Sequence, residues 1–208
     1  MAQIIPTGST DPPGAGNGTA RRFLRNTHIF SSAVKEVLEA KFLHEATSHP
    51  LTVPQFHLLK LIAINGGHQV GQIAGLMGVS SPAASKNIDK LEGLGLVTRS
   101  PSEGDRRAIL LSASSKGRRV VKRYEEIKAS RLKPVLQKFL PDDLQQFTNM
   151  LERFSVLLYQ QESSEERFCL RCAAYTDDHC AINNVLGNCT YEKIRSRGHR
   201  PGAHAEVP

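Results

Sequence analysis

All four cysteines of the chain lie in one short stretch near its C-terminus, which reads CLRCAAYTDDHCAINNVLGNC. The thiols follow the spacing C-x2-C-x7-C-x8-C. The N-terminal segment has neither the basic region nor the apolar stretch of a secretory signal, so we expect a cytoplasmic protein. Because disulfides are rare in that reducing compartment, the four thiols are more typical of a metal site. The predicted ligands are Cys169, Cys172, Cys180 and Cys189.

The spacing favours an iron–sulfur cluster and leaves zinc as the alternative. Cys169 and Cys172 form a chelating turn that suits either metal, whereas structural zinc sites usually offer a second close pair. Cys180 and Cys189 instead arrive singly, as expected at the corners of a larger cluster. Four cysteines are also the usual ligand count of a [2Fe–2S] or [4Fe–4S] centre. His179 keeps a zinc site with mixed ligands open, and a metal-free thiol switch is a further possibility.

Composition and motifs argue against a membrane protein and against an enzyme. The apolar runs are far shorter than the ~20 residues that span a bilayer. The chain has no phosphate-binding glycine loop, no HExxH motif and no nucleophile elbow. Its net charge of +7 is concentrated in the middle, where residues 51–130 hold 12 lysines and arginines against 6 acidic residues. A basic segment of this kind suits a polyanion such as nucleic acid.

Apolar periodicity and helix-end signals predict a mainly α fold with one β-hairpin. Residues 1–22, rich in Gly, Pro, Ser and Thr, are predicted to be a disordered arm. The expected order is an amphipathic helix around Phe30–Phe42, a helix from Pro54 to Ile64, and a helix–turn–helix. Two short strands, LVTRS and AILLSA, then enclose a polar turn. A long helix beginning after Ser112 or Ser114 and a last helix beginning at Pro141 complete the pattern.

A helix–turn–helix followed by a basic hairpin predicts a winged helix–turn–helix that binds DNA. The second helix of such a pair enters the major groove with its N-terminal residues at the base edges. Small residues permit close approach, Ser and Asn offer hydrogen bonds, and lysines contact phosphates. The predicted groove-facing residues are Ser80, Ser81, Ala83, Ala84, Ser85, Lys86, Asn87 and Lys90.

The hairpin tip, PSEGDRR, is the second predicted DNA contact. Asp105 is placed to brace a neighbouring arginine. The remaining guanidinium of the Arg106–Arg107 pair would then enter the electronegative minor groove.

The run LTVPQFHLLKLI, followed by LEGLGLVTR, GDRRAILLS and KG, resembles the MarR family of bacterial transcriptional regulators. The resemblance covers about residues 27–161. It implies a winged-helix homodimer whose first and last helices interlock, and whose recognition helices read successive major grooves of a near-palindrome. It also implies repression that a ligand or oxidant relieves. By resemblance, Asp105 and Arg107 match the family's wing pair, and Ser81–Asn87 matches its recognition helix.

The family pattern ends before the cysteines, so the tail is a departure from it. We expect a homodimeric DNA-binding regulator, not an enzyme, whose DNA affinity responds to redox state, oxygen or nitric oxide through an iron–sulfur cluster. The alternative is a regulator with a structural zinc site that responds to a small-molecule effector. The predicted segments are the arm (1–22), the winged-helix domain with its dimerisation helices (23–162), the cysteine module (163–192) and a basic disordered tail (193–208).

Overall fold

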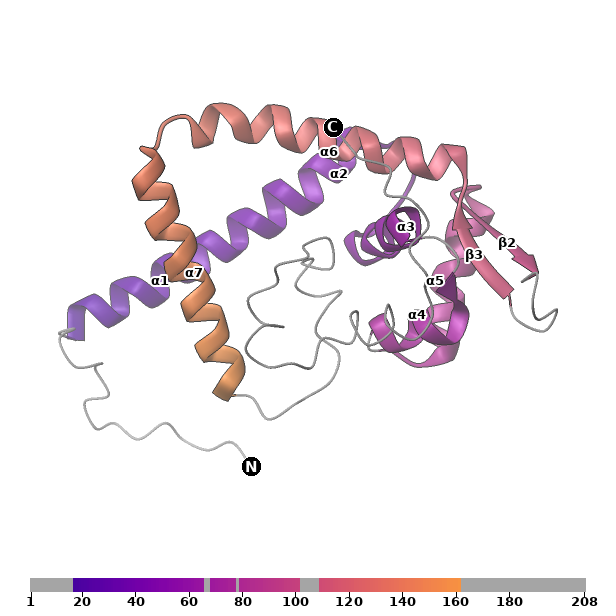
Figure 1. Cartoon of the computed structure of the whole chain (residues 1–208), viewed down its shortest axis with the longest axis horizontal. Helices are drawn as coiled ribbons and strands as arrows, with labels where there is room; N and C mark the ends of the chain where they lie inside the picture. Colours follow the sequence, from indigo (N-terminus) through magenta and orange to yellow (C-terminus); the bar gives the residue numbers. More distant parts are fainter. Residues whose placement is uncertain (1–16, 66–67, 78, 102–108, 162–208) are drawn as a thin grey trace.

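Long helices form one side of the molecule, and a lobe of shorter helices and strands forms the other (Figure 1). The computed structural model describes residues 17–65, 68–77, 79–101 and 109–161. Its elements are mostly helical with one small sheet, so the predicted fold class is confirmed. Within the described residues, no helix is long and apolar enough to cross a membrane.

The N-terminal helical rod is longer than the sequence predicted. Helix α1 (Asn17–Ala33), the π-helix η1 (Val34–Lys41) and α2 (Phe42–Ala46) follow one another without a break. Residues 17–22 are therefore helical, and their assignment to a disordered arm was wrong. The physical reason lies in the adjoining turn, where the ring of Phe23 packs edge-on against Phe154 with ring centroids 4.9 Å apart. This contact gives the start of the helix a tertiary partner that the local sequence does not reveal.

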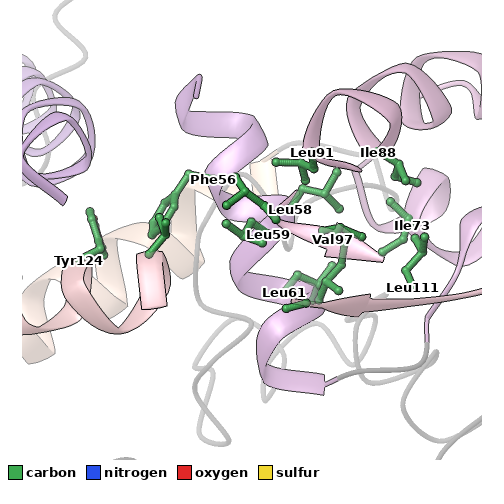
Figure 2. Close-up of a cluster of buried hydrophobic side chains, with 14 of the residues drawn as sticks. Phe56, Leu58, Leu59, Leu61, Ile73, Ile88, Leu91, Val97, Leu111 and Tyr124 are labelled. Carbon is green, nitrogen blue, oxygen red and sulfur yellow. The ribbon is translucent and has the colours of Figure 1, made fainter. Parts of the chain in front are cut away.

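Helix α3 (Val53–Asn65) is the centre of the lobe. It begins with a reciprocal cap, in which the Gln55 backbone N–H donates to Thr52 Oγ1 (3.4 Å) and Thr52 N–H donates to Gln55 Oε1 (3.1 Å). Thr52 and Gln55 thus form a capping box, which satisfies two backbone N–H groups at the start of the helix. Apolar side chains from α3, the two helices after it and the strands meet in one core (Figure 2); the fully buried members include Phe56, Leu58, Leu59, Leu61, Ile73, Ile88, Leu91, Val97 and Leu111.

The sheet has three antiparallel strands in the order β1-β3-β2. Strands β2 (Val97–Pro101) and β3 (Ile109–Ala113) form the predicted hairpin, with Val97 opposite Ala113. Strand β1 (His68–Gln69) pairs with β3 and was not predicted. Two residues carry no alternating pattern, so this strand exists only because β3 supplies its partner.

The joint between the lobe and the long helix α6 (Ser115–Leu136) is closely packed. Ser114 caps the helix by accepting from Gly117 N–H (3.0 Å), while its own hydroxyl donates to Gly95 O (2.7 Å). Lys116 Nζ donates to Leu94 O at 3.0 Å. Gly95 turns the chain just after the helix Ser81–Gly93. Its φ of +70° lies in the left-handed region that favours glycine. The joint therefore couples the direction of α6 to the end of the helix–turn–helix.

Two polar contacts made by α6 continue this coupling. The buried Tyr124 hydroxyl donates to the carbonyl of Leu38 in η1 at 2.7 Å, and burial raises the pKa of Tyr124 to about 12. Glu125 forms an ion pair with Lys60 of α3 at 2.6 Å. Burial alone would raise the pKa of Glu125, but the hydrogen bonds and charges of Lys60 and Lys128 outweigh it and lower that pKa. Glu125 thus stays ionised, and α6 is held to both η1 and α3.

Helix α7 (Pro141–Gln161) crosses α1 and completes the long-helix side (Figure 1). Besides the Phe23–Phe154 pair, Phe30 and Phe147 pack edge to face with centroids 5.8 Å apart. This side of the molecule nevertheless leaves many large apolar side chains exposed in the single chain: Leu24 and Ile29 of α1, Val37 of η1, Leu140 just before α7, and Met150, Leu157 and Leu158 of α7.

Candidate DNA-binding surface

The helix–turn–helix consists of α4 (Val70–Met77) and α5 (Ser81–Gly93), as predicted. Ser80 is the N-cap of α5, because its hydroxyl accepts from Ala83 N–H at 3.4 Å, and Pro82 lies in the first turn. The fixed φ of proline and the cap both define where the helix begins. Helix α5 therefore starts at the residues expected to meet DNA.

One face of α5 packs into the lobe and the other faces solvent. Ala84, Ile88 and Leu91 are buried at successive helical turns. Ala84 has 0% of its surface exposed, so its assignment as a groove-facing residue was wrong. Its methyl group belongs to the apolar stripe that fixes α5 on the core, one helical turn before Ile88.

The remaining predicted residues of α5 lie at or near the solvent-facing side. Ser80, Ser81, Lys86 and Lys90 are exposed, whereas Ala83, Ser85 and Asn87 are half-buried. Within the described part of the chain, Lys86 and Lys90 form no ion pair. Their ammonium groups are thus available to phosphates.

Asn87 is engaged with its own protein. Its Nδ2 donates to Ala83 O at 3.0 Å, and Gln55 Nε2 donates to Asn87 Oδ1 at 3.3 Å. The second bond joins the start of α3 to α5, so Asn87 holds the helix in position whatever else it contacts. Gln55 was missed in the sequence because nothing local indicates a partner 32 residues away.

Arg99 of β2 is a second residue that the sequence did not single out. Its Nη1 lies 2.8 Å from Glu92 Oε2, and its Nη2 lies 2.5 Å from Asp89 Oδ1. Both carboxylates belong to α5, so the forked guanidinium joins the hairpin to the helix. Glu92 and Arg99 both belong to the motif LEGLGLVTR, but the sequence alone does not show that the turn at Gly95 brings these two side chains together.

The other predicted site residues lie outside the described residues. These are Asp105, Arg106 and Arg107 of the hairpin tip, and the four cysteines Cys169, Cys172, Cys180 and Cys189. Strand β2, paired with β3, lies beside α5 (Figure 1). Among the described residues, no group of three or more His, Cys, Asp or Glu side chains is placed to hold a metal ion.

Comparison with known proteins agrees with this geometry. The family model described as "MarR family" matches residues 51–109. The chain is 30% identical over 130 residues to the uncharacterized HTH-type transcriptional regulator YfiV of Bacillus subtilis (strain 168), covering 58% of this chain and 81% of that protein.

Solved structures share the fold at lower identity. FabT of Streptococcus pneumoniae, solved in complex with DNA, aligns with a TM-score of 0.58 and 17% identity over 67% of this chain and 99% of that one. RV1404 of Mycobacterium tuberculosis aligns with a TM-score of 0.55 and 22% identity over 65% of this chain and 92% of that one.

Proposed function

Because the chain belongs to the MarR family of DNA-binding transcriptional regulators, and is thus a regulator rather than an enzyme, we propose that it binds a near-palindromic operator as a homodimer. The observation that carries this proposal is the capped helix α5, which presents Ser81, Lys86 and Lys90 beside the hairpin. A helix of this kind enters the major groove with its N-terminal turn. Two copies would read half-sites about one helical turn, or roughly 34 Å, apart.

The hairpin supplies the second contact in this proposal. Asp105 would brace a neighbouring arginine, and Arg107 would enter the minor groove beside each half-site, where the narrow groove concentrates negative potential. Lys86 and Lys90 would neutralise phosphates, which releases counterions and makes the affinity strongly dependent on salt.

Replacing Arg107 with alanine is the test of this arrangement. We expect the parent protein to protect one discrete near-palindrome in a DNase footprint, and Arg107→Ala to bind the same duplex roughly tenfold more weakly at physiological salt. Arg119→Ala is the matched control, because Arg119 is exposed on α6 and not on α5 or the hairpin. Equal affinity of Arg107→Ala and the parent would refute the wing contact, and uniform protection of DNA would indicate a non-specific coating protein instead.

The homodimer is proposed from the long-helix side of the molecule. Helices α1 and α7 contact each other through two aromatic pairs, yet they leave a series of large apolar side chains exposed. Exposed apolar surface of this extent marks an interaction site. The pattern fits a second copy interlocking its own first and last helices with these two.

The four-cysteine tail is proposed to be the sensor. Cys169 follows shortly after the end of α7 at Gln161, so a cluster held by the four cysteines is continuous with a helix of the proposed dimer interface. When bound, an iron–sulfur cluster would link Cys169, Cys172, Cys180 and Cys189 into one rigid module. Loss of the cluster on exposure to oxidants or nitric oxide would free these thiols and let α7 shift. The distance between the two copies of α5, and hence the DNA affinity, would change with it.

Protein purified without oxygen tests the cluster. We expect a brown preparation with visible absorption and iron and sulfide in the amounts of one cluster per four cysteines. Cys172→Ala should lose the colour while remaining folded. A colourless anaerobic protein that carries zinc and no iron would contradict the cluster and favour the structural zinc site. Equal operator affinity of holo protein and Cys172→Ala, with and without oxidant, would rule out sensing by the tail.

A further inference from the structure

Helix α5 carries no net charge of its own, although it is the element proposed to approach a polyanion. Its residues include two lysines, Lys86 and Lys90, and two acids, Asp89 and Glu92. The side chain of Asp89 is 60% exposed and that of Glu92 is 39% exposed, so neither carboxylate is hidden in the core. In a groove lined by phosphates, both would oppose binding.

Arg99 contacts both of these carboxylates at once. One guanidinium nitrogen lies 2.5 Å from Asp89 and the other 2.8 Å from Glu92, which uses the fork geometry that distinguishes arginine from lysine. Asp89 and Glu92 are three residues apart on α5, so they lie on the same side of the helix and face the same strand. Strand β2, paired with β3, fixes where the guanidinium lies.

We propose that Arg99 is an internal counterion of the DNA-binding surface, which neutralises Asp89 and Glu92 so that α5 can approach DNA phosphates. Exposed ion pairs contribute little to folding stability. We therefore expect the loss of Arg99 to weaken DNA binding more than it weakens folding. With Arg99, the helix and its counterion carry one net positive charge; without it, the two carboxylates cancel both lysines. This inference rests on the proposed function, and it makes Arg99 a positioning residue rather than a DNA contact.

The experiment removes the counterion and then the charges that it neutralises. The probe is a short DNA duplex selected by the parent protein from a randomised pool. We expect Arg99→Gln to bind this duplex roughly tenfold more weakly at about 0.1 M salt, with a deficit that shrinks as salt screens the carboxylates. The triple variant Arg99→Gln, Asp89→Asn and Glu92→Gln should bind within about twofold of the parent, because no uncompensated carboxylate remains.

Two further variants separate charge from folding. Arg99→Lys keeps the charge and should bind within about threefold of the parent, although an ammonium cannot span both carboxylates with the same geometry. Arg131→Gln removes a comparable exposed pair with Glu45 (3.0 Å) that does not involve α5, and it should bind like the parent. Circular dichroism and thermal unfolding establish that each variant is folded.

The possible outcomes distinguish this inference from the function on which it rests. A triple variant as weak as Arg99→Gln, or an Arg99→Gln variant as tight as the parent, overturns the counterion role and leaves the DNA-binding function standing. A parent protein that selects no duplex and binds none at low salt overturns both.

Discussion

Replacing Met150 and Leu157 with glutamate is expected to convert the protein into a folded monomer and to lower its affinity for the operator by about a hundredfold or more. Both residues lie on α7, one heptad apart and therefore on the same face. Their side chains are 68% and 49% exposed in the single chain, so the substitution leaves the described core intact. Sedimentation at micromolar concentration measures the assembly, and a gel-shift titration measures the affinity.

The expected loss follows from how a dimer binds. Once one half-site is occupied, the second copy of α5 meets its own half-site at a high effective concentration. A monomer has only one helix and one hairpin, and it loses that gain although every residue of its DNA-binding surface is unchanged.

A matched control adds the same two charges elsewhere on the same helix. Gln145→Glu with Gln160→Glu places them at exposed positions that are already polar, and this variant should remain dimeric and bind normally. A parent protein that sediments as a folded monomer would contradict the proposed dimer. A Met150→Glu, Leu157→Glu variant that stays dimeric would contradict the assignment of this face of α7 to the dimer interface.

Gly117→Ala is expected to lower the free energy of unfolding by about 2–3 kcal/mol, the cost of forcing extra volume into a packed site. A Cβ at this position would lie 2.1 Å from the carbonyl oxygen of Leu96 and 3.0 Å from Leu59 Cδ1. The backbone oxygen cannot turn aside as a side chain would. The first turn of α6 would have to move away from the end of the helix–turn–helix, which breaks the cap at Ser114 and the bond from Lys116.

Gly75→Ala provides the comparison for Gly117→Ala. Gly75 is also helical, but an added Cβ would meet nothing within 4 Å. Alanine is preferred to glycine in a helix, so this variant should be neutral or more stable by up to about 1 kcal/mol. Urea unfolding of both variants at one protein concentration tests the pair, because the stability of a dimer depends on concentration. A Gly117→Ala variant as stable as the parent would mean that the joint is not closely packed.

Local signals in the sequence were sufficient for the order of the elements and for the general site. Ser80 and Thr52 cap helices with bonds that reach only three residues along the chain, so the local pattern determines them. Local sequence also determines the hairpin strands and the turn at Gly95. Glycine adopts the positive φ of this turn without strain. These features predicted that a hairpin follows the helix–turn–helix along the chain, without any knowledge of packing.

Tertiary structure alone decided which side chains of that site are exposed to solvent and so can reach DNA. Ala84 and Lys86 are two residues apart, yet one is buried and the other exposed, because the rotation of α5 is set by its packing against the rest of the core. The partners of Arg99, Gln55 and Gly117 are likewise brought together only by the fold. Local sequence encodes where an element starts and stops; contacts between distant residues determine its rotation, and the rotation determines which charges face DNA and which carboxylates need a counterion.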